Sequence, residues 1–226
     1  MPRPPNLLND DGSASMATAL MMSHHAFRRD LARFVRALVG VAQREPAHLE
    51  ALREQWKFFR NALHGHHESE DTRVFPSLAE EQPSIAPLIK KLTEDHHLID
   101  PLLERGDRAF ADLPKTDAAA AVLAELKALL DEHLAEEEAE IVPFLRGAKA
   151  FPPPANDVEA ELYAQGFAWA SNGIATEVLE KLDEMLPEVL RQKLPAARER
   201  FNATCESVWG AAGPASSRTP VPDFMA

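Results

Sequence analysis

Apolar side chains recur at steps of three and four residues along four separate stretches of this sequence. One such stripe contains Leu123, Leu126 and Leu130. This spacing places side chains on one face of an α-helix, and proline-containing breaks separate the stretches. We expect helices from about Ser15 to Gln43, from Pro46 toward Pro76, from Ser84 to the Leu113-Pro114 connection, and from Asp117 to Leu145. Long amphipathic helices with short connections predict an all-α fold: an up-down-up-down four-helix bundle with a C-terminal helical extension.

The composition changes on either side of these four stretches. The segment FPPPA at 151–155 is typical of a rigid linker, and a tail rich in Gly, Pro and Ser is typical of disorder. Shorter helical stretches lie near 157–170, 174–185 and 187–208, interrupted by Pro187 and Pro195. We therefore expect a disordered arm over 1–14, the bundle over 15–147, a Pro-rich linker over 148–155, a helical extension packing on the bundle over 156–209, and a disordered tail over 210–226.

Charge and cysteine content exclude several classes of protein. The formal net charge of −12 argues against nucleic-acid partners and against anionic membrane surfaces. The single cysteine, Cys205, excludes an internal disulfide, a zinc finger and a cysteine-ligated cluster, and it fits a reducing cytoplasm. No apolar run approaches the roughly 20 residues of a membrane span. We expect a cytoplasmic protein without nucleic-acid or membrane partners, and the sequence indicates no particular oligomeric state.

Eight of the nine histidines fall in four short clusters, one on each expected helix. Two clusters continue into the same longer pattern, in which a glutamate follows the histidine by four residues, a second acid by five and a proline by ten. These patterns are His66, Glu70, Asp71 and Pro76 on the second helix, and His133, Glu137, Glu138 and Pro143 on the fourth. The first and third helices carry His24-His25 and His96-His97. The chain thus contains two helical hairpins, each with a histidine followed by an HxxxE motif.

These polar residues lie on the stripes that we expect to face the core. Side chains four apart on a helix share a face, so an imidazole and a carboxylate in HxxxE can converge on one metal ion. Burying a carboxylate without a compensating charge costs about several kcal/mol of free energy, unless the carboxylate takes up a proton and becomes neutral. Bound cations would compensate two carboxylates and four imidazoles in a bundle interior. A donor set of histidine and carboxylate without sulfur suits iron or manganese, and less distinctively zinc.

The stretches HHAFRRDL, HGHHESEDTRVFP, EDHHLIDPLL and DEHLAEEEAEIVPFL resemble the hemerythrin-like family, also called the HHE cation-binding domain, over residues 15–147. The resemblance implies a left-handed four-helix bundle with two oxo- or hydroxo-bridged iron ions and two bridging carboxylates; manganese or zinc is less favoured. Carried over by position, the metal ligands are His24, His66, Glu70, His96, His133 and Glu137, with Glu70 and Glu137 bridging.

The sequence departs from oxygen-carrying hemerythrins at two places. Those have HxxxH on the third helix, whereas Asp100 stands four residues after His96 here, and on the fourth helix both Glu137 and Glu138 are present. The pattern H–HxxxE–H–HxxxE resembles the bacterial hemerythrin-like subgroup instead. One imidazole fewer argues against reversible oxygen carriage and favours a more open coordination sphere for peroxide, nitric oxide or oxygen activation.

Further residues are expected near the ligands without binding the metal. His25, His67 and His97 are each rotated by about 100° from a predicted ligand, which favours the helix flank. Tyr163 is a candidate donor to a bound oxygen species, whereas His64 is expected on the surface. The whole set comprises His25, His67, Asp71, His97, Asp100, Glu138 and Tyr163.

Three functions remain open at this stage. The leading interpretation is a non-haem di-iron protein that reacts with peroxide, dioxygen or nitric oxide, with catalase-like or peroxidase-like turnover. The alternatives are an oxygen or iron sensor or binding protein without turnover, and a di-iron oxygenase acting on a small organic substrate in a pocket formed by residues 157–208. The sequence leaves open whether the protein is an enzyme.

Overall fold

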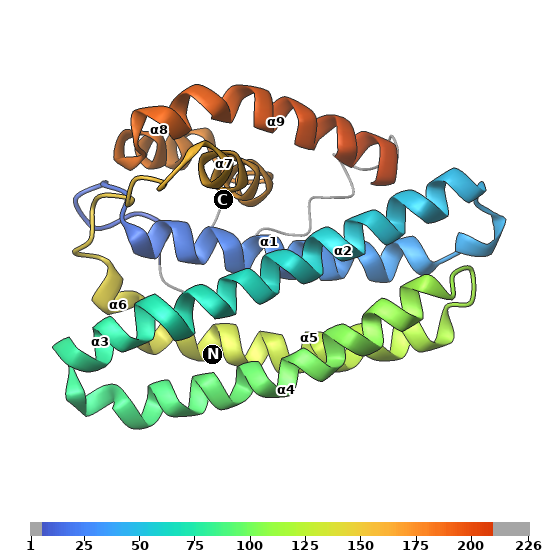
Figure 1. Cartoon of the computed structure of the whole chain (residues 1–226), viewed down its shortest axis with the longest axis horizontal. Coiled ribbons are helices and arrows are strands. Elements are labelled where there is room, and N and C mark those ends of the chain that lie inside the picture. Colours follow the sequence, from blue (N-terminus) through green and yellow to red (C-terminus); the bar gives the residue numbers. More distant parts are fainter. Residues whose placement is uncertain (1–5, 210–226) are drawn as a thin grey trace. The chain divides into compact units, whose positions relative to one another are not determined.

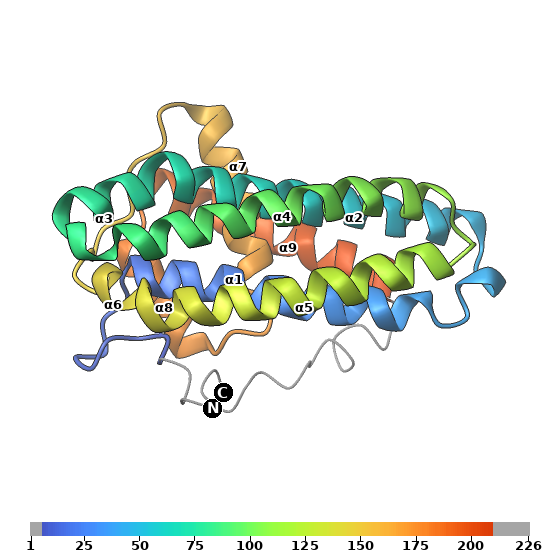
Figure 2. The same ribbon diagram turned by 90° about the horizontal axis from the view of Figure 1, so that it is seen from below.

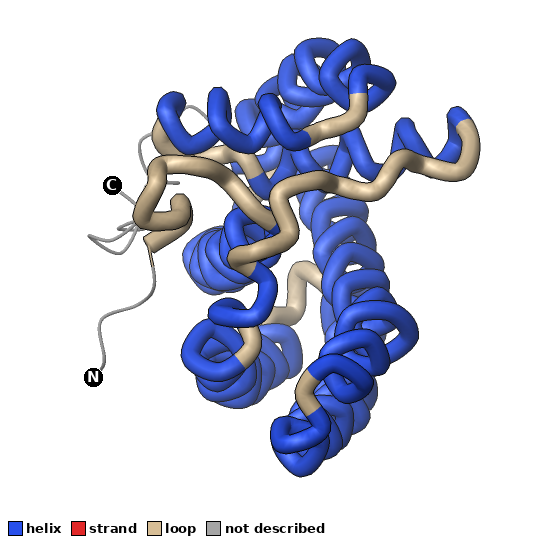
Figure 3. The backbone as a smooth tube through the Cα atoms, turned by 90° about the vertical axis from the view of Figure 1, so that its left-hand side faces the viewer, coloured by secondary structure: helices blue, strands red, loops and turns tan. Residues whose placement is uncertain are grey.

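The chain folds into helices joined by short connections. The computed structural model describes residues 6–209, and every regular element in that range is a helix (Figure 3), which confirms the expected all-α class. The elements labelled in Figure 1 are α1 (Met16–Leu38), α2 (Pro46–Ser69), α3 (Phe75–Glu81), α4 (Ala86–Ala111), α5 (Asp117–Glu140), α6 (Val142–Leu145), α7 (Asp157–Ala170), α8 (Thr176–Met185) and α9 (Glu188–Trp209). None of the helices in this range is long and apolar enough to cross a membrane. The disorder expected for residues 1–5 and 210–226 concerns segments outside the described residues.

The contacts within the chain group it into two compact units. Residues 30–134 form one, here called the central unit; residues 1–29 and 135–226 form the other, here called the two-segment unit. Helices α1 and α5 each contribute residues to both units. This grouping differs from the expected division at residues 148–155, which stays a prediction.

The core of the central unit contains an aromatic cluster. Trp56 on α2 stacks on Phe110 of α4, with ring centroids 4.5 Å apart and an interplanar angle of 7°. Phe34 meets the rings of Trp56, Phe59 and Phe110 edge-on, at 5.2–5.8 Å between centroids. All four side chains are buried, and such pairs add about 0.5–1.5 kcal/mol each to the stabilisation from burial itself. The cluster therefore fastens α2 to α4, two helices that also lie together in Figure 2.

Two expected helix boundaries shift. The first helix was expected to reach Gln43, but α1 ends at Leu38 because Gly40 adopts a positive φ of 71°, which is favourable for glycine and terminates the helix. The fourth helix was expected to reach Leu145, but α5 ends at Glu140 and the short helix α6 follows. Pro195, expected to interrupt the last helix, instead lies inside α9.

The helix expected to run from Pro46 toward Pro76 changes its winding on the way. Residues Glu70–Val74 form a π-helical segment between α2 and α3. Pro76 has no N–H to donate to the carbonyl of Thr72, so the α-helical pattern cannot continue unchanged through it. A π segment accommodates an extra residue in one turn and is frequent at functional sites. It begins at Glu70, the acid of the first HxxxE motif.

In the two-segment unit, α7 packs against α9 and against the first half of α1. Ala164, Ala168 and Ala197 form a close-packed cluster between α7 and α9, covered by Phe201. The guanidinium of Arg29, on α1, donates to the carbonyl oxygens of Trp169 at 3.0 Å and Asn172 at 2.8 Å, at the carboxyl end of α7. Arg29 is only 1% exposed. A cation at that end of a helix is stabilised by the unpaired carbonyls and the helix dipole, so Arg29 ties α7 to α1.

Residues 6–14, which belong to the arm expected before the bundle, contact other parts of the two-segment unit. The side chain of Leu7 is buried, and its carbonyl oxygen accepts a hydrogen bond of 2.7 Å from the Thr18 hydroxyl. Arg146 donates to the carbonyl oxygen of Leu8 and to the side chain of Asn9. The segment is therefore held by side chains from distant parts of the sequence, which its own composition does not reveal.

Replacing Arg29 with methionine is expected to lower the free energy of unfolding by about 2–4 kcal/mol, because the carbonyls of Trp169 and Asn172, at the carboxyl end of α7, lose a charged donor. Urea unfolding followed by circular dichroism measures the change. Arg36→Met, an exposed change on the same helix, is the matched control and should stay within about 0.5 kcal/mol of the wild type. Equal effects of the two substitutions would contradict this role for Arg29.

Candidate metal centre

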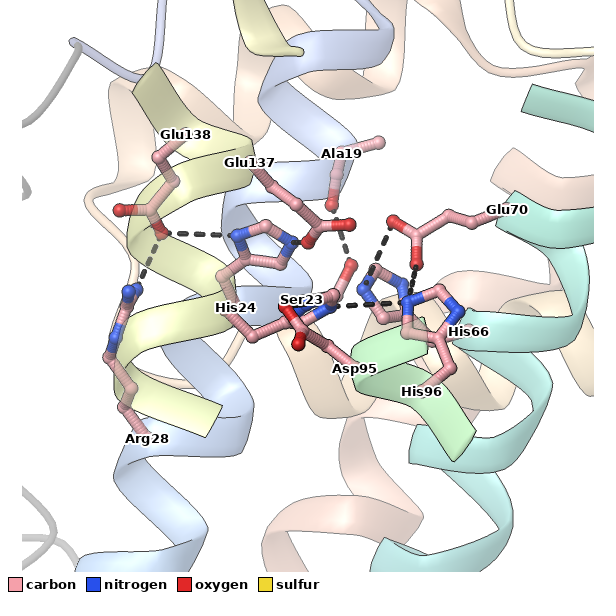
Figure 4. A network of polar contacts seen from close by, with 11 residues as sticks. Ala19, Ser23, His24, Arg28, His66, Glu70, Asp95, His96, Glu137 and Glu138 are labelled. Carbon is pink, nitrogen blue, oxygen red and sulfur yellow. Dashed lines mark hydrogen bonds and ion pairs between the residues drawn. The ribbon is translucent and has the colours of Figure 1, made fainter. Parts of the chain in front are cut away.

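Three helices of the central unit bring imidazoles and a carboxylate together. The Nε2 atom of His66 lies 3.3 Å from Oε1 of Glu70, and Nε2 of His96 lies 3.7 Å from Oε2 of the same glutamate. His96 and His133 approach each other at 3.2 Å between their Nε2 atoms. Figure 4 shows the Glu70 carboxylate beside the imidazoles of His66 and His96. Glu70, His96 and His133 are buried, and the His66 side chain is 10% exposed.

These separations suit donors that share an ion. Two donor atoms that each lie about 2.1 Å from one metal ion, at angles of about 90–110°, are about 3.0–3.4 Å apart. The contact of His66 with Glu70 and that of His96 with His133 fall in this range. The donors are imidazole nitrogens and carboxylate oxygens without sulfur, a set that suits iron, manganese or zinc. The residues therefore fit a metal ion in both position and chemistry.

In the two-segment unit, His24 lies between two glutamates of α5 (Figure 4). Its Nε2 atom is 3.4 Å from Oε2 of Glu137, and its Nδ1 atom is 3.1 Å from Oε1 of Glu138. Glu138 also accepts a 2.5 Å hydrogen bond from Arg28. His24 and Glu137 are 0% exposed. The unit thus presents one imidazole nitrogen and one carboxylate side by side.

Burial favours the neutral forms of His24 and His96, and neutral imidazole is the form that binds metals. Burial lowers the pKa of His24, although the hydrogen bond and the negative charge of Glu138 act to raise it. Burial likewise lowers the pKa of His96 against the opposing effect of Asp71. For Glu138, burial alone would raise the pKa, but the hydrogen bond with His24 and the charge of Arg28 lower it, so this side chain stays a carboxylate.

Carboxylates also contact the outer nitrogens of the candidate ligands. Nδ1 of His96 lies 3.0 Å from Oδ2 of Asp71, and Asp71 accepts a 2.8 Å hydrogen bond from Thr93. Nδ1 of His133 lies 3.7 Å from Oδ2 of Asp95. A carboxylate at Nδ1 favours the tautomer whose Nε2 lone pair is available to a metal, and it fixes the ring. Both Asp71 and Glu138 therefore touch a candidate ligand.

Sequence reasoning missed three of these neighbours, Arg28, Thr93 and Asp95. For two of them, the spacing from a histidine in the sequence could have indicated the contact. Arg28 follows His24 by four residues, and Thr93 precedes His96 by three, so each shares a helix face with its histidine. Asp95 adjoins His96 in sequence but meets His133 on another helix, which only the packing of α4 against α5 reveals.

The other residues expected near the ligands have varied surroundings. His25 is buried and faces the turn at Gly173, where an added Cβ would stand 3.3 Å from its Nε2 atom. His97 is exposed, whereas Asp100 lies 3.7 Å from His64, which is also exposed. Tyr163 donates a 2.6 Å hydrogen bond to Glu159 on the same helix, so its hydroxyl has a different partner from the expected oxygen species.

His67 occupies a more central place than its position on an ideal helix indicates. It was expected on the helix flank, but its side chain is buried and its ring stacks on that of His96, with centroids 4.0 Å apart. The donor nitrogens of His67, His96 and His133 all lie within 4.8 Å of one another. His67 is thus part of the buried imidazole cluster of the central unit.

Fold and site together define a helical protein whose buried histidines and glutamates form groups that could hold a metal ion. The chain belongs to the hemerythrin HHE cation binding domain family, whose family model matches residues 15–145. This confirms the resemblance drawn from the four histidine-containing stretches. Comparison with curated proteins and with solved structures finds no match.

Proposed function

We propose that this protein holds two iron ions between His24, His66, Glu70, His96, His133 and Glu137, with Glu70 and Glu137 each shared by both ions. The observation that carries the proposal is the burial of two carboxylates, Glu70 at 2% and Glu137 at 0% exposure, beside imidazoles whose neutral form is favoured. Cations offset the cost of that burial. On α5, which is one unbroken helix, His133 and Glu137 are four residues apart and share a face.

The fold that accompanies this centre is an up-down-up-down bundle of α1, α2, α4 and α5. The short connections between these helices favour antiparallel neighbours. The repeated motif places one HxxxE on the second helix of each hairpin, so each hairpin contributes one carboxylate and two imidazoles. This is the H–HxxxE–H–HxxxE arrangement that we assign to the bacterial hemerythrin-like subgroup.

The activity we propose is a cytoplasmic reaction with peroxide, dioxygen or nitric oxide, with catalase-like or peroxidase-like turnover. The iron pair, when bound, supplies one-electron and two-electron redox chemistry. The chain's own residues exclude water by burial, favour the neutral forms of His24 and His96 and hold these two rings in place. Asp71, itself held by Thr93, orients His96, whereas Glu138, held by Arg28, orients His24.

One observation favours a sensor or binding protein as the second candidate. Arg29 lies five residues after His24 on α1 and binds the carboxyl end of α7 directly. A change in the position of α1 on metal or ligand binding would therefore be transmitted to α7. Rapid gas release from added peroxide supports the enzyme, whereas a stable and reversible absorption change with oxygen supports the binding protein.

The metal assignment is tested by elemental analysis and a near-ultraviolet and visible spectrum of aerobically purified protein. We expect about two iron ions per chain, with charge-transfer bands in the near ultraviolet. His66→Ala should lower the metal content well below two, while His64→Ala, which removes an exposed neighbouring imidazole, should not. A wild-type protein that purifies and reconstitutes without iron, or full loading of His66→Ala, would refute the proposal.

A further inference from the structure

In the two-segment unit, the carboxylate that contacts the outer nitrogen of His24 is paired with a cation. Oε1 of Glu138 lies 3.1 Å from Nδ1 of His24, and the same oxygen accepts a 2.5 Å hydrogen bond from Arg28. The Glu138 side chain is 9% exposed and that of Arg28 is 25% exposed, so water screens this ion pair only partly. The charges of Glu138 and Arg28 oppose each other at His24. Together the two side chains carry no net charge.

In the central unit, the corresponding carboxylate is held by a neutral group. Oδ2 of Asp71 lies 3.0 Å from Nδ1 of His96, and Oδ1 of Asp71 accepts a 2.8 Å hydrogen bond from the Thr93 hydroxyl. Two further carboxylates, those of Asp95 and Asp100, also place negative charge near His96. The hydroxyl of Thr93 orients Asp71 without neutralising it, so the surroundings of His96 are more negative than those of His24.

Lys91 offsets part of the negative charge in the central unit. Its ammonium group lies 3.2 Å from Oδ2 of Asp95, but the Lys91 side chain is 47% exposed, so solvent screens much of its charge. Without counting Asp100, the charges of Asp71, Asp95 and Lys91 still sum to one negative charge. The two units thus differ by about one charge in the groups that surround their candidate ligands.

The ligands proposed above give neither ion an advantage by themselves. His96 and His133, with 3.2 Å between their Nε2 atoms, suit one ion, which leaves His24 and His66 for the other. Each ion then binds two imidazoles and shares both carboxylates with its neighbour. The difference between the two ions therefore lies in the charge around the ligands, and a cation is held more tightly where that charge is negative.

We propose that the two metal positions are inequivalent: the position of His96 and His133 fills first and the position of His24 fills second, with Arg28 setting the order. This inference rests on the proposed two-ion centre and deepens it. We expect the two affinities to differ by about 10-fold to 100-fold, the range typical of losing a charged partner that contacts a metal ligand. The position of His24 is thus the one from which an ion exchanges more readily.

Crystals of the wild-type protein loaded with one equivalent of Co²⁺ test the order of filling without any variant. At one equivalent the ratio of occupancies is the square root of the ratio of affinities, so the anomalous signal beside His96 and His133 should be about 3–10 times that beside His24. Equal signals, or a stronger signal beside His24, would overturn the inference and leave the two-ion centre intact. A chain that binds no Co²⁺, or a single ion at saturation, would instead refute the proposed function.

Substitutions of Arg28 separate its charge from the shape of its side chain. Arg28→Met removes the charge, whereas Arg28→Lys keeps it. We expect Arg28→Met to bring the two Co²⁺ affinities together by tightening the weaker one, and Arg28→Lys to keep the wild-type difference. Arg36→Met, an exposed change on the same helix, should also keep it. Optical titration with Co²⁺ measures both affinities. An unchanged or wider difference in Arg28→Met would show that the charge of Arg28 does not set the order.

Discussion

Glu137→Gln is expected to make the metal-free protein more stable and at the same time unable to hold its full metal load. The carboxylate of Glu137 is 0% exposed and lies 3.4 Å from a His24 imidazole whose lowered pKa keeps it neutral. Burial of that carboxylate without a cation is costly, whereas an amide of nearly the same shape carries no charge. We expect a gain of about 1–3 kcal/mol in the free energy of unfolding with a chelator present, and the loss of at least one bound ion.

Urea unfolding in the presence of EDTA and elemental analysis after reconstitution measure the two effects on the same preparations. Glu140→Gln, one turn further along α5 at an exposed position, is the matched control. It should change the free energy of unfolding by no more than about 0.5 kcal/mol and leave the metal content as in the wild type. The essential result is that the free energy of unfolding without metal rises while the metal content falls. A Glu137→Gln protein that is less stable without metal would show that this carboxylate stabilises the fold by itself.

Gly106→Ala is expected to destabilise the protein by about 2–4 kcal/mol, toward the upper end of the cost of overpacking a core. A Cβ at this position would stand 1.9 Å from Cζ2 of Trp56 and within 3.0 Å of two further ring atoms. The indole cannot move aside easily, because it stacks on Phe110 and donates a 2.8 Å hydrogen bond to Asp107. Helix α4 must therefore shift away from α2, which opens the aromatic cluster.

Gly65→Ala provides the control for the same substitution within a helix. An added Cβ there meets nothing within 4 Å, and the residue is exposed on α2. Alanine is the better helix former, so this change should stabilise the protein by about 0.5–1 kcal/mol. Thermal and urea unfolding of the two variants would show opposite shifts. A neutral result for Gly106→Ala would mean that Trp56 has an alternative rotamer of similar energy.

The sequence predicted the helices well, because their existence depends on a periodicity that each segment carries by itself. The stripe containing Leu123, Leu126 and Leu130 is buried on α5 as expected. Helix ends were less predictable, because they depend on single backbone choices such as the positive φ of Gly40. The contacts of residues 6–14 could not be predicted, since Leu7 and Asn9 are held by Thr18 and Arg146 rather than by their neighbours in sequence.

In the candidate site, too, some residues could be predicted from local sequence patterns and others depend on packing between helices. Glu70 and Glu137 could be selected from the sequence, because the HxxxE spacing and the apolar stripe are local patterns, and both side chains are buried. The place of His67 could not be selected, because an ideal helix turns it away from the core and the stacking on His96 requires the packing of α2 against α4. Local spacing thus identifies which residues have the right chemistry, while packing between helices decides which of them meet.

The two-segment unit also has a consequence for the order of events during synthesis. Its first segment, which contains Met21, Met22 and Phe27, leaves the ribosome more than 100 residues before residues 135–226, its partners in this unit. All residues of the central unit emerge in between, so that unit can collapse while the first half of α1 still presents its apolar side chains to solvent. Nascent chains of this length therefore expose apolar surface of the kind that favours aggregation.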